Sequence, residues 1–133
     1  MPEAVLNKPG PLDRRDLNLV RGHSYYTYRI LYRVPETREI AAWAGYHHER
    51  LDGRGYPFGL AAPEIDTGAR LLAAADVFVA LVEDRPYRAG LPRAGVKAVM
   101  REAVRSGALD AAAVDVLLGW CDELIGRLRR LGH

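Results

Sequence analysis

The sequence predicts an all-α fold. Apolar residues recur at intervals of three and four along several segments, which is the spacing of one helix face. No stretch of useful length alternates between apolar and polar residues, as a half-buried strand would. Glycine and proline gather between the periodic segments, where they end helices. A length of 133 residues is typical of a single domain with its own core, so we expect one domain over residues 1–133.

The first part of the chain is predicted to be a loop followed by two helices. Residues 1–12 contain three prolines and a glycine, so they cannot form a continuous helix. Asp13 is expected to cap a short helix that extends to Val20. The sequence YYTYRILY at residues 25–32 places apolar groups at helical spacing, and Pro35 interrupts this second helix.

Four further helices are predicted after Pro35. Thr37 is expected to cap the first of them. Its apolar face consists of Ile40, Trp43, Ala44 and His47. A glycine-rich loop over residues 51–60 follows, and then a helix over 67–82 that is apolar nearly all round and is expected to be central and buried. The last two helices are expected at 93–106 and 110–131, and residues 119–133 form the end of the final one.

Composition excludes several classes of protein. The net charge of +2 gives no basic excess that would indicate nucleic-acid binding. The apolar run at residues 71–82 contains Asp76 and is too short to span a bilayer, and residues 1–10 lack the pattern of a signal peptide. The single Cys121 excludes an intramolecular disulfide and is expected to be a buried core residue. We expect a cytoplasmic protein with no nucleic-acid or membrane partner.

His47 and His48 are adjacent at the expected end of a helix. Consecutive residues lie about 100° apart on a helix, so both side chains can point the same way only where the helix ends. The glycine loop begins within five residues, so the helix is expected to end there. Two imidazoles that converge on one point suit metal ligation. The alternative is that His47 is a hydrogen-bonded core histidine and His48 a solvated neighbour.

Asp76 stands in the most apolar predicted helix, where an unpaired carboxylate would cost several kcal/mol. A buried aspartate there must be paired, hydrogen-bonded or bound to a cation. Arg70 and Arg85 are candidate ion-pair partners. Metal ligation together with the histidines is the alternative, although the spacing from His23 through the His47–His48 pair to Asp76 matches no compact zinc motif. Residue spacing leaves both interpretations open.

Two loops carry further candidates. In the first, Gly53 and Gly55 permit left-handed backbone conformations, and Tyr56-Pro57 stiffens the end of the loop. Tyr56 is either a packing aromatic or a surface on which a nucleobase stacks. In the second, DRPYR at residues 84–88 presents Arg85 and Arg88, which suit bidentate contact with phosphate. A solvated or salt-bridged turn is the alternative for this second loop.

The combination of these segments resembles one known family. HHERLDGRGYP at 47–57, GARLLAAADVFVAL at 68–81 and DRPYR at 84–88 closely resemble the HD-GYP family of metal-dependent phosphohydrolases, bacterial enzymes that hydrolyse cyclic di-GMP. PEAVLNKPGPL at 2–12 resembles the family segment just downstream of its His-Asp motif. The similarity extends from about residue 2 to residue 118, so residues 13–118 are expected to form the family-like helical core.

The resemblance implies an all-helical domain that holds two or three metal ions, usually iron or manganese. It implies that His23, His47 and His48 are metal ligands and that Asp76 matches the last aspartate ligand of the family. Tyr56 would line the nucleotide cleft, and the ligand phosphates would contact Arg85 and Arg88. The implied reaction is in-line attack of a metal-bridging hydroxide on phosphorus.

The sequence departs from the family pattern in three places. It contains no His-Asp dipeptide. Ser24 follows His23 where the family often has proline, and Val79 stands where an acidic residue is common, which is expected to loosen the site. We therefore expect at most one weakly bound metal per chain and little hydrolysis by this chain alone, unless a longer or companion chain supplies the missing motif.

Two other interpretations are open. In one, the chain is a non-catalytic module that binds cyclic di-GMP or a protein partner through the GYP loop. In the other, it is a fragment without independent activity. The apolar faces of the helices at 25–32 and 67–82 are expected to bind a protein partner or a second copy of the chain if nothing else covers them.

Overall fold

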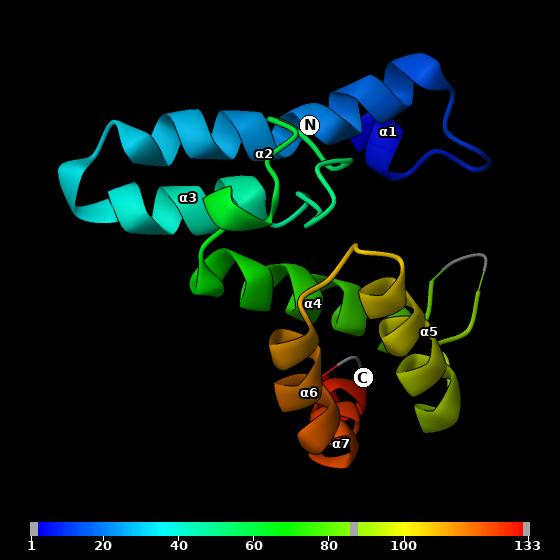
Figure 1. The fold of residues 1–133 in the computed structure, drawn as a ribbon. Coiled ribbons are helices and arrows are strands. Elements are labelled where there is room, and N and C mark those ends of the chain that lie inside the picture. The colour runs from blue at the N-terminus through cyan, green and yellow to red at the C-terminus, as the bar shows by residue number, and fades with distance from the viewer. Residues whose placement is uncertain (1–2, 86–87, 132–133) are drawn as a thin grey trace.

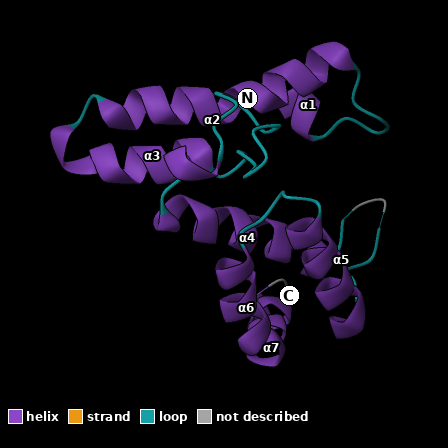
Figure 2. Cartoon of the chain, in the orientation of Figure 1, coloured by secondary structure: helices purple, strands orange, loops and turns teal. Residues whose placement is uncertain are grey.

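A computed structural model describes residues 3–85 and 88–131, and it confirms the all-α fold (Figure 1). No strand occurs in these residues (Figure 2). The α-helices are α1 (Glu3–Leu6), α2 (Arg14–Tyr32), α3 (Arg38–Tyr46), α4 (Thr67–Val82), α5 (Arg93–Arg105), α6 (Ala111–Gly119) and α7 (Cys121–Leu131). Two short 3-10 helices span Pro35–Thr37 and Ala62–Glu64. None of the described helices is long and apolar enough to cross a membrane.

The helices form two groups that meet along α4. Helices α2 and α3 pack side by side as an antiparallel hairpin, with the 3-10 helix at Pro35–Thr37 in the turn (Figure 1). Helix α4 packs against α3 on one side and against α5, α6 and α7 on the other. The glycine-rich loop connects α3 to α4 and lies beside the α2–α3 hairpin (Figure 1). The predicted central position of the 67–82 helix is therefore confirmed.

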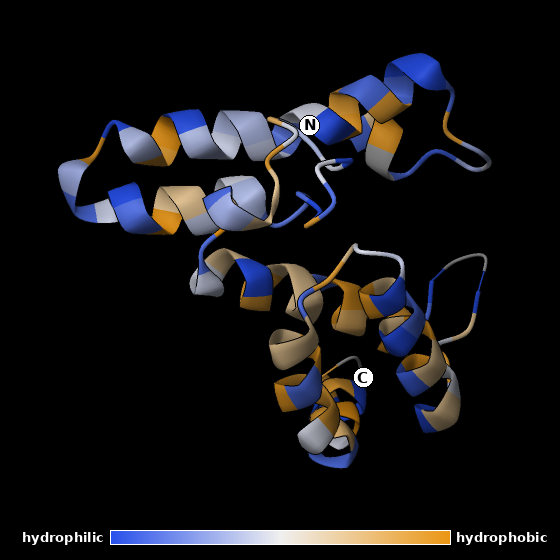
Figure 3. Cartoon of the chain, in the orientation of Figure 1, coloured by the Kyte–Doolittle hydropathy of each residue, from blue (hydrophilic) through white to orange (hydrophobic). Residues whose placement is uncertain are grey.

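The hydrophobic core lies in the second group of helices. Its fully buried side chains include Phe78 from α4, Val96 and Met100 from α5, and Val114 from α6. Figure 3 shows apolar residues along α4 and α6, whereas hydrophilic residues are frequent on α2. Cys121 is buried in this core, as predicted. The buried apolar residues are thus concentrated around α4, which also forms one wall of a pocket.

Helix α2 is one continuous helix, so the prediction of a helix that ends at Val20 and another over 25–32 was wrong. Asp13 caps it as expected: its carboxylate accepts from the backbone N–H groups of Arg15 and Asp16 at 2.8 and 2.9 Å. Residues 21–24 continue the helix because no proline interrupts them, and the buried Ser24 hydroxyl donates to the Arg21 carbonyl at 3.3 Å. As a result, His23 is held in the middle of a 19-residue helix.

The predicted helix over 110–131 is divided into α6 and α7 at Trp120. The backbone of Trp120 leaves the helical region, and its N–H donates to the carbonyls of Leu117 and Leu118, which closes α6. The turn lets α7 cross both α4 and α5, so that Cys121 and Ile125 are buried. A straight helix would have carried them away from the core. Val114 and Leu118 of α6 and Cys121 and Ile125 of α7 nevertheless all pack in the same core.

The start of α3 at Thr37 was predicted correctly, but the side chain of Thr37 does not cap it. The Thr37 hydroxyl donates instead to the carbonyl of Leu31 at 2.7 Å, across the turn from α2. The position of α4 against α3 is fixed by Asp66, the N-cap of α4. Its carboxylate accepts from the backbone N–H of Ala69 at 2.9 Å and from the indole N–H of Trp43 on α3 at 3.1 Å. Asp66 thereby sets the position of α4 relative to α3.

Candidate metal centre

Three histidine side chains converge between α2, α3 and the loop that follows α3. His23 comes from the middle of α2, His47 stands at the C-terminal end of α3, and His48 is the next residue. The ring centroids of His47 and His48 are 3.9 Å apart, and that of His23 lies 5.5 and 5.0 Å from them. One nitrogen of each ring lies within 4.8 Å of the other two. The spacing is that of a small cluster able to surround one ion.

The convergence of His47 and His48 has the predicted cause. Helix α3 ends at Tyr46, and His47 is its C-cap. The backbone then turns, with the N–H of Glu49 donating to the carbonyl of Tyr46 at 2.8 Å. Because the helix is not continued, consecutive side chains are freed from the 100° separation of a helix and lie on one side of the chain.

Two of the rings are oriented by hydrogen bonds to the backbone. Nδ1 of His47 lies 2.6 Å from the carbonyl oxygen of Ala44, and Nδ1 of His23 bonds to the carbonyl of Val20. A carbonyl oxygen only accepts, so each Nδ1 carries the proton and each Nε2 presents a lone pair. Metal-binding histidines commonly donate their second N–H to a carbonyl in this way. The donor set therefore fits a divalent transition-metal ion.

His48 is uncharged at neutral pH. Burial, with the neighbouring His47 as a second cause, lowers the pKa of His48 from 6.5 to about 4. Its Nδ1 lies 3.9 Å from Oδ2 of Asp76, which is too long for a hydrogen bond. The neutral imidazole and the carboxylate are therefore neighbours, and they form no ion pair in this structure.

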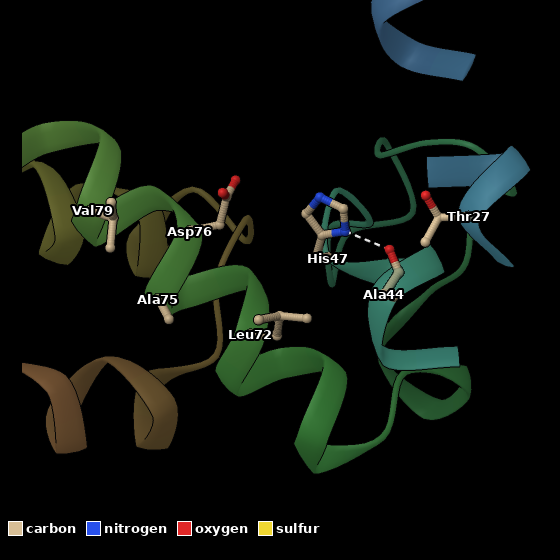
Figure 4. A pocket seen from close by; sticks show the side chains of 7 residues that line it. All are labelled: Thr27, Ala44, His47, Leu72, Ala75, Asp76 and Val79. Atoms are coloured by element: carbon tan, nitrogen blue, oxygen red, sulfur yellow. Dashed lines mark hydrogen bonds between the residues drawn. The ribbon is translucent and has the colours of Figure 1, made fainter. Parts of the chain in front are cut away.

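The expectation that Asp76 is buried was wrong. Half of its side chain, 51%, is exposed, because it points from α4 into a pocket between α4 and the α2–α3 hairpin. The pocket has a volume of about 390 Å³. Its lining residues are Thr27, Ala44, His47, Leu72, Ala75, Asp76 and Val79. Figure 4 shows Asp76 and His47 on facing walls. Arg70 and Arg85 are paired elsewhere, with Asp110 at 3.1 Å and Glu83 at 3.8 Å.

Glu49 holds the glycine-rich loop in place through hydrogen bonds, a role that sequence reasoning missed. Its side chain is buried, with 4% exposed, and its two carboxylate oxygens accept from the backbone N–H groups of Phe58 and Leu60 at 2.6 and 2.8 Å. A buried carboxylate with both oxygens bonded to backbone donors strongly fixes the loop that supplies them. The sequence signal was a glutamate adjacent to the histidine pair and to a loop rich in backbone donors.

The glycines of this loop have different roles. Gly53 has a φ of +78°, the left-handed conformation that was predicted for it. Gly55 has no positive φ. A side chain at Gly55 would collide with the backbone that carries His48 and Glu49, 2.6 Å from the His48 carbonyl oxygen. Gly55 thus lets the loop fold back on the histidine segment, and the N–H of Tyr56 then donates to that carbonyl at 3.2 Å.

Tyr56 lies against the histidine cluster. Its ring stacks on His48 with centroids 4.9 Å apart, and the guanidinium of Arg21 from α2 lies 5.5 Å from its centroid. Burial raises the pKa of Tyr56. The following residue, Pro57, carries the chain to Phe58. The structure therefore joins Tyr56 to the site, together with an arginine that sequence reasoning had not selected.

An aromatic cluster holds α2, α3 and the loop together beside the histidines. Tyr28 stacks on Tyr46 with centroids 5.8 Å apart, and the Phe58 ring lies 5.3 and 5.7 Å from the two tyrosines. Burial raises the pKa of Tyr46. Because these rings join the two helices and the loop that supply His23, His47 and Tyr56, they fix the distances within the site.

Arg85 and Arg88 are on the loop that follows α4, and residues 86–87 between them are outside the described part of the chain. The backbones of Arg85 and Arg88 are joined by two hydrogen bonds of 2.7 and 3.0 Å. The guanidinium of Arg88 donates to the carbonyl of Ala80 on α4 at 2.7 Å. Their predicted contact with phosphate stays a prediction.

Comparison with known proteins assigns this arrangement to a family. Residues 1–113 match the HD domain family. The chain belongs to it. This HD domain chain is 42% identical to the 3'3'-cGAMP-specific phosphodiesterase 1 of Vibrio cholerae over 117 residues, which are 88% of the chain and 27% of that protein.

Two further relatives carry related names. The cyclic di-GMP phosphodiesterase response regulator RpfG of Xanthomonas campestris is 39% identical over 121 residues, 89% of the chain and 32% of that protein. A cyclic di-GMP phosphodiesterase of Thermotoga maritima is 40% identical over 90 residues, 66% of the chain and 24% of that protein. The HD domain chain thus spans 24–32% of the length of these relatives. The resemblance noted from the sequence is confirmed at the level of the family.

Proposed function

We propose that this HD domain chain supplies the histidine side of a metal-dependent phosphodiesterase centre whose substrate is a guanine-containing cyclic dinucleotide. The observation that carries the proposal is the cluster of His23, His47 and His48, with Nδ1 of the first two tied to backbone carbonyls. The relatives named above act on cyclic di-GMP or 3'3'-cGAMP, which share a guanine nucleotide and two phosphodiester bonds.

The three histidines would hold one divalent ion, and the resemblance implies iron or manganese. Imidazole is a suitable ligand for iron. A bound ion of this kind supplies Lewis acidity and lowers the pKa of a coordinated water. The chain contributes fixed ring orientations and, in His48, an imidazole that does not have to lose a proton at neutral pH.

The pocket beside the cluster would receive the reacting phosphodiester. It is lined by His47 and Asp76 and otherwise by mostly apolar side chains, the usual composition of a ligand pocket. Asp76 would either join the metal ligands or, at its present 3.9 Å from His48, stabilise the imidazole from outside. Tyr56 would form part of the nucleotide cleft, and Arg85 and Arg88 would contact a phosphate.

The chain is proposed to hydrolyse its substrate poorly by itself. Within residues 3–85 and 88–131, His23, His47 and His48 form the one group of three or more potential ligand side chains close enough to hold an ion. A second ion, as in two-metal phosphodiester hydrolysis, would need ligands from elsewhere. The alternative of a non-catalytic binding module rests on the same pocket and on Tyr56. Association through Tyr26, Ile30, Leu71 and Leu72, which are exposed on α2 and α4, stays a prediction.

Metal loading followed by a hydrolysis assay tests the proposal. The folded chain is titrated with Mn²⁺ or, under anaerobic conditions, Fe²⁺, and the bound ions are counted by elemental analysis. We expect at most one ion per chain, loss of binding in His47→Ala, and slow conversion of cyclic di-GMP to a linear product. Two or more tightly held irons per chain would contradict the single-ion proposal. Tight cyclic di-GMP binding without any metal-dependent hydrolysis would favour the binding module.

A further inference from the structure

Arg21 stands beside the histidine cluster. It is an exposed residue of α2, two residues before His23. The loop after α3 brings Tyr56 back to this point, so that the guanidinium lies 5.5 Å from the centre of the tyrosine ring. Tyr56 in turn stacks on His48 at 4.9 Å. Helix α2 and the loop after α3 together place a permanent positive charge next to the cluster.

The donors of Arg21 remain available, unlike those of several arginines in the neighbourhood. Arg50 is held by both oxygens of Asp52, and Arg70 by Asp110 at 3.1 Å. Arg88 donates to a carbonyl of α4. For Arg21, no carboxylate or carbonyl of the described residues lies within hydrogen-bond distance of the guanidinium. A phosphate arriving beside Tyr56 and His48 would thus meet the donors of Arg21 without displacing an existing partner.

The contact with Tyr56 orients this arginine without consuming its donors. A guanidinium over an aromatic face is attracted by the ring and keeps its N–H groups in its own plane, directed outward. Guanidinium groups bind phosphate through two parallel charge-assisted hydrogen bonds. The ring therefore limits the rotamers of a long side chain before the ligand binds, which reduces the entropy lost on binding.

We propose that Arg21 is a phosphate-binding residue of the cyclic dinucleotide site and that Tyr56 acts as its support. The inference rests on the proposed function and adds a ligand contact to it. Tyr56 then serves less as a bare surface for base stacking than as the platform that holds Arg21 beside the histidine cluster. Arg21 is better prepared than Arg88 to bind a phosphate, because the Arg88 guanidinium already donates to the carbonyl of Ala80.

Calorimetry with cyclic di-GMP and metal-loaded protein tests this role. Arg21→Ala should weaken binding at least about tenfold, the usual effect of losing a hydrogen-bonded charge at an anion. Arg21→Lys should recover only part of the affinity, because an ammonium group cannot bind in the bidentate geometry. The dependence of affinity on salt concentration should also be weaker for Arg21→Ala than for the unaltered chain.

Arg14→Ala is the matched control. Arg14 is an exposed arginine at the first residue of α2, so the substitution removes the same charge from the same helix. Its affinity should stay within about twofold of the unaltered chain. Equal affinity of Arg21→Ala and the unaltered chain, or equal losses in Arg21→Ala and Arg14→Ala, overturns the role of Arg21 and leaves the proposed function standing. Absence of binding to the folded, metal-loaded, unaltered chain overturns both.

Discussion

Gly45 of α3 lies directly against Tyr28 of α2. A β-carbon at position 45 would fall 2.8 Å from the β-carbon of Tyr28, closer than packed side chains approach. This contact lets the two helices lie close together, and it is two residues from His47. Because His23 comes from α2 and His47 from α3, the closeness of the helices at Gly45 sets the separation of two of the three imidazoles.

Gly45→Ala should therefore weaken both folding and metal binding. The added methyl group must push α2 and α3 apart, at a cost of about 1–3 kcal/mol that exceeds the gain of about 0.5–1 kcal/mol from replacing a helical glycine. Denaturant unfolding measures the first effect and Mn²⁺ titration the second. The control is Gly126→Ala on α7, where a β-carbon would meet only the Arg130 guanidinium at 3.6 Å. The control should be slightly stabilising, and equal behaviour of the two variants would contradict the argument.

Glu49→Gln should destabilise the glycine-rich loop. Each carboxylate oxygen now accepts one backbone N–H, so the amide –NH₂ of glutamine would face a donor and leave it unsatisfied. The expected cost is about 1–3 kcal/mol for a buried group, measured by denaturant unfolding. Hydrogen exchange should show faster exchange at Phe58 and Leu60. In the control Glu64→Gln, one exposed oxygen accepts from Ala61 and the amide can face water, so little change is expected. A loss in the control as large as in Glu49→Gln would argue against a specific role.

The contribution of Asp52 to the stability of the fold should decrease as the pH falls. Hydrogen bonds from Arg50, and then from the backbone N–H of Arg54, lower its pKa from 3.8 to about 2. A lowered folded-state pKa contributes stability that is present above about pH 4 and is lost as pH falls toward 2.

The thermal midpoint of Asp52→Asn should therefore lie below that of the unaltered chain at pH 6, and the difference should shrink between pH 4 and pH 2. Thermal unfolding followed by circular dichroism across this range measures it. The comparison is Asp122→Asn. This substitution removes an exposed carboxylate on α7 that is paired with Arg93 on α5. A difference between Asp52→Asn and the unaltered chain that stays constant down to pH 2 would refute the assignment.

Local signals in the sequence were enough to predict much of the fold. Helix α4 has the predicted bounds, since it is a long apolar segment and loops rich in glycine and proline flank it. The meeting of His47 and His48 followed from the end of α3. The break at Trp120 was missed because the apolar pattern continues through it. Only the packing of α7 across α4 and α5 decides that the helix bends there.

Contacts between distant residues could not be predicted from the sequence. The bonds of Glu49 to Phe58 and Leu60 depend on how the loop folds back, and no periodicity reports that path. The contact of Arg21 with Tyr56 joins residues on a helix and a loop far apart in sequence. The exposure of Asp76 was mispredicted because an apolar helix was taken to be covered on every side, whereas one side of α4 faces an open pocket.

The position of Asp76 predicts that it contributes less to metal affinity than His47 does. Its carboxylate is 3.9 Å from Nδ1 of His48 and lies outside the group formed by the three imidazoles. His47 belongs to that group, and its Nε2 has a free lone pair. A residue that contacts the ion should matter more than one that acts on a ligand from outside, where substitutions usually cost 10–100-fold in affinity.

Asp76→Asn should therefore weaken Mn²⁺ binding by about 10–100-fold, and His47→Ala should weaken it further. Isothermal titration of both variants and the unaltered chain measures the order. Asp115→Asn is the control, because Asp115 is an exposed carboxylate of α6 paired with Arg101, and removing it should leave the affinity unchanged. If Asp76→Asn abolished binding as fully as His47→Ala did, the carboxylate would be a direct ligand, and α4 would have to approach α3 when the ion binds. That movement would close the pocket shown in Figure 4, because Asp76 and His47 form its facing walls.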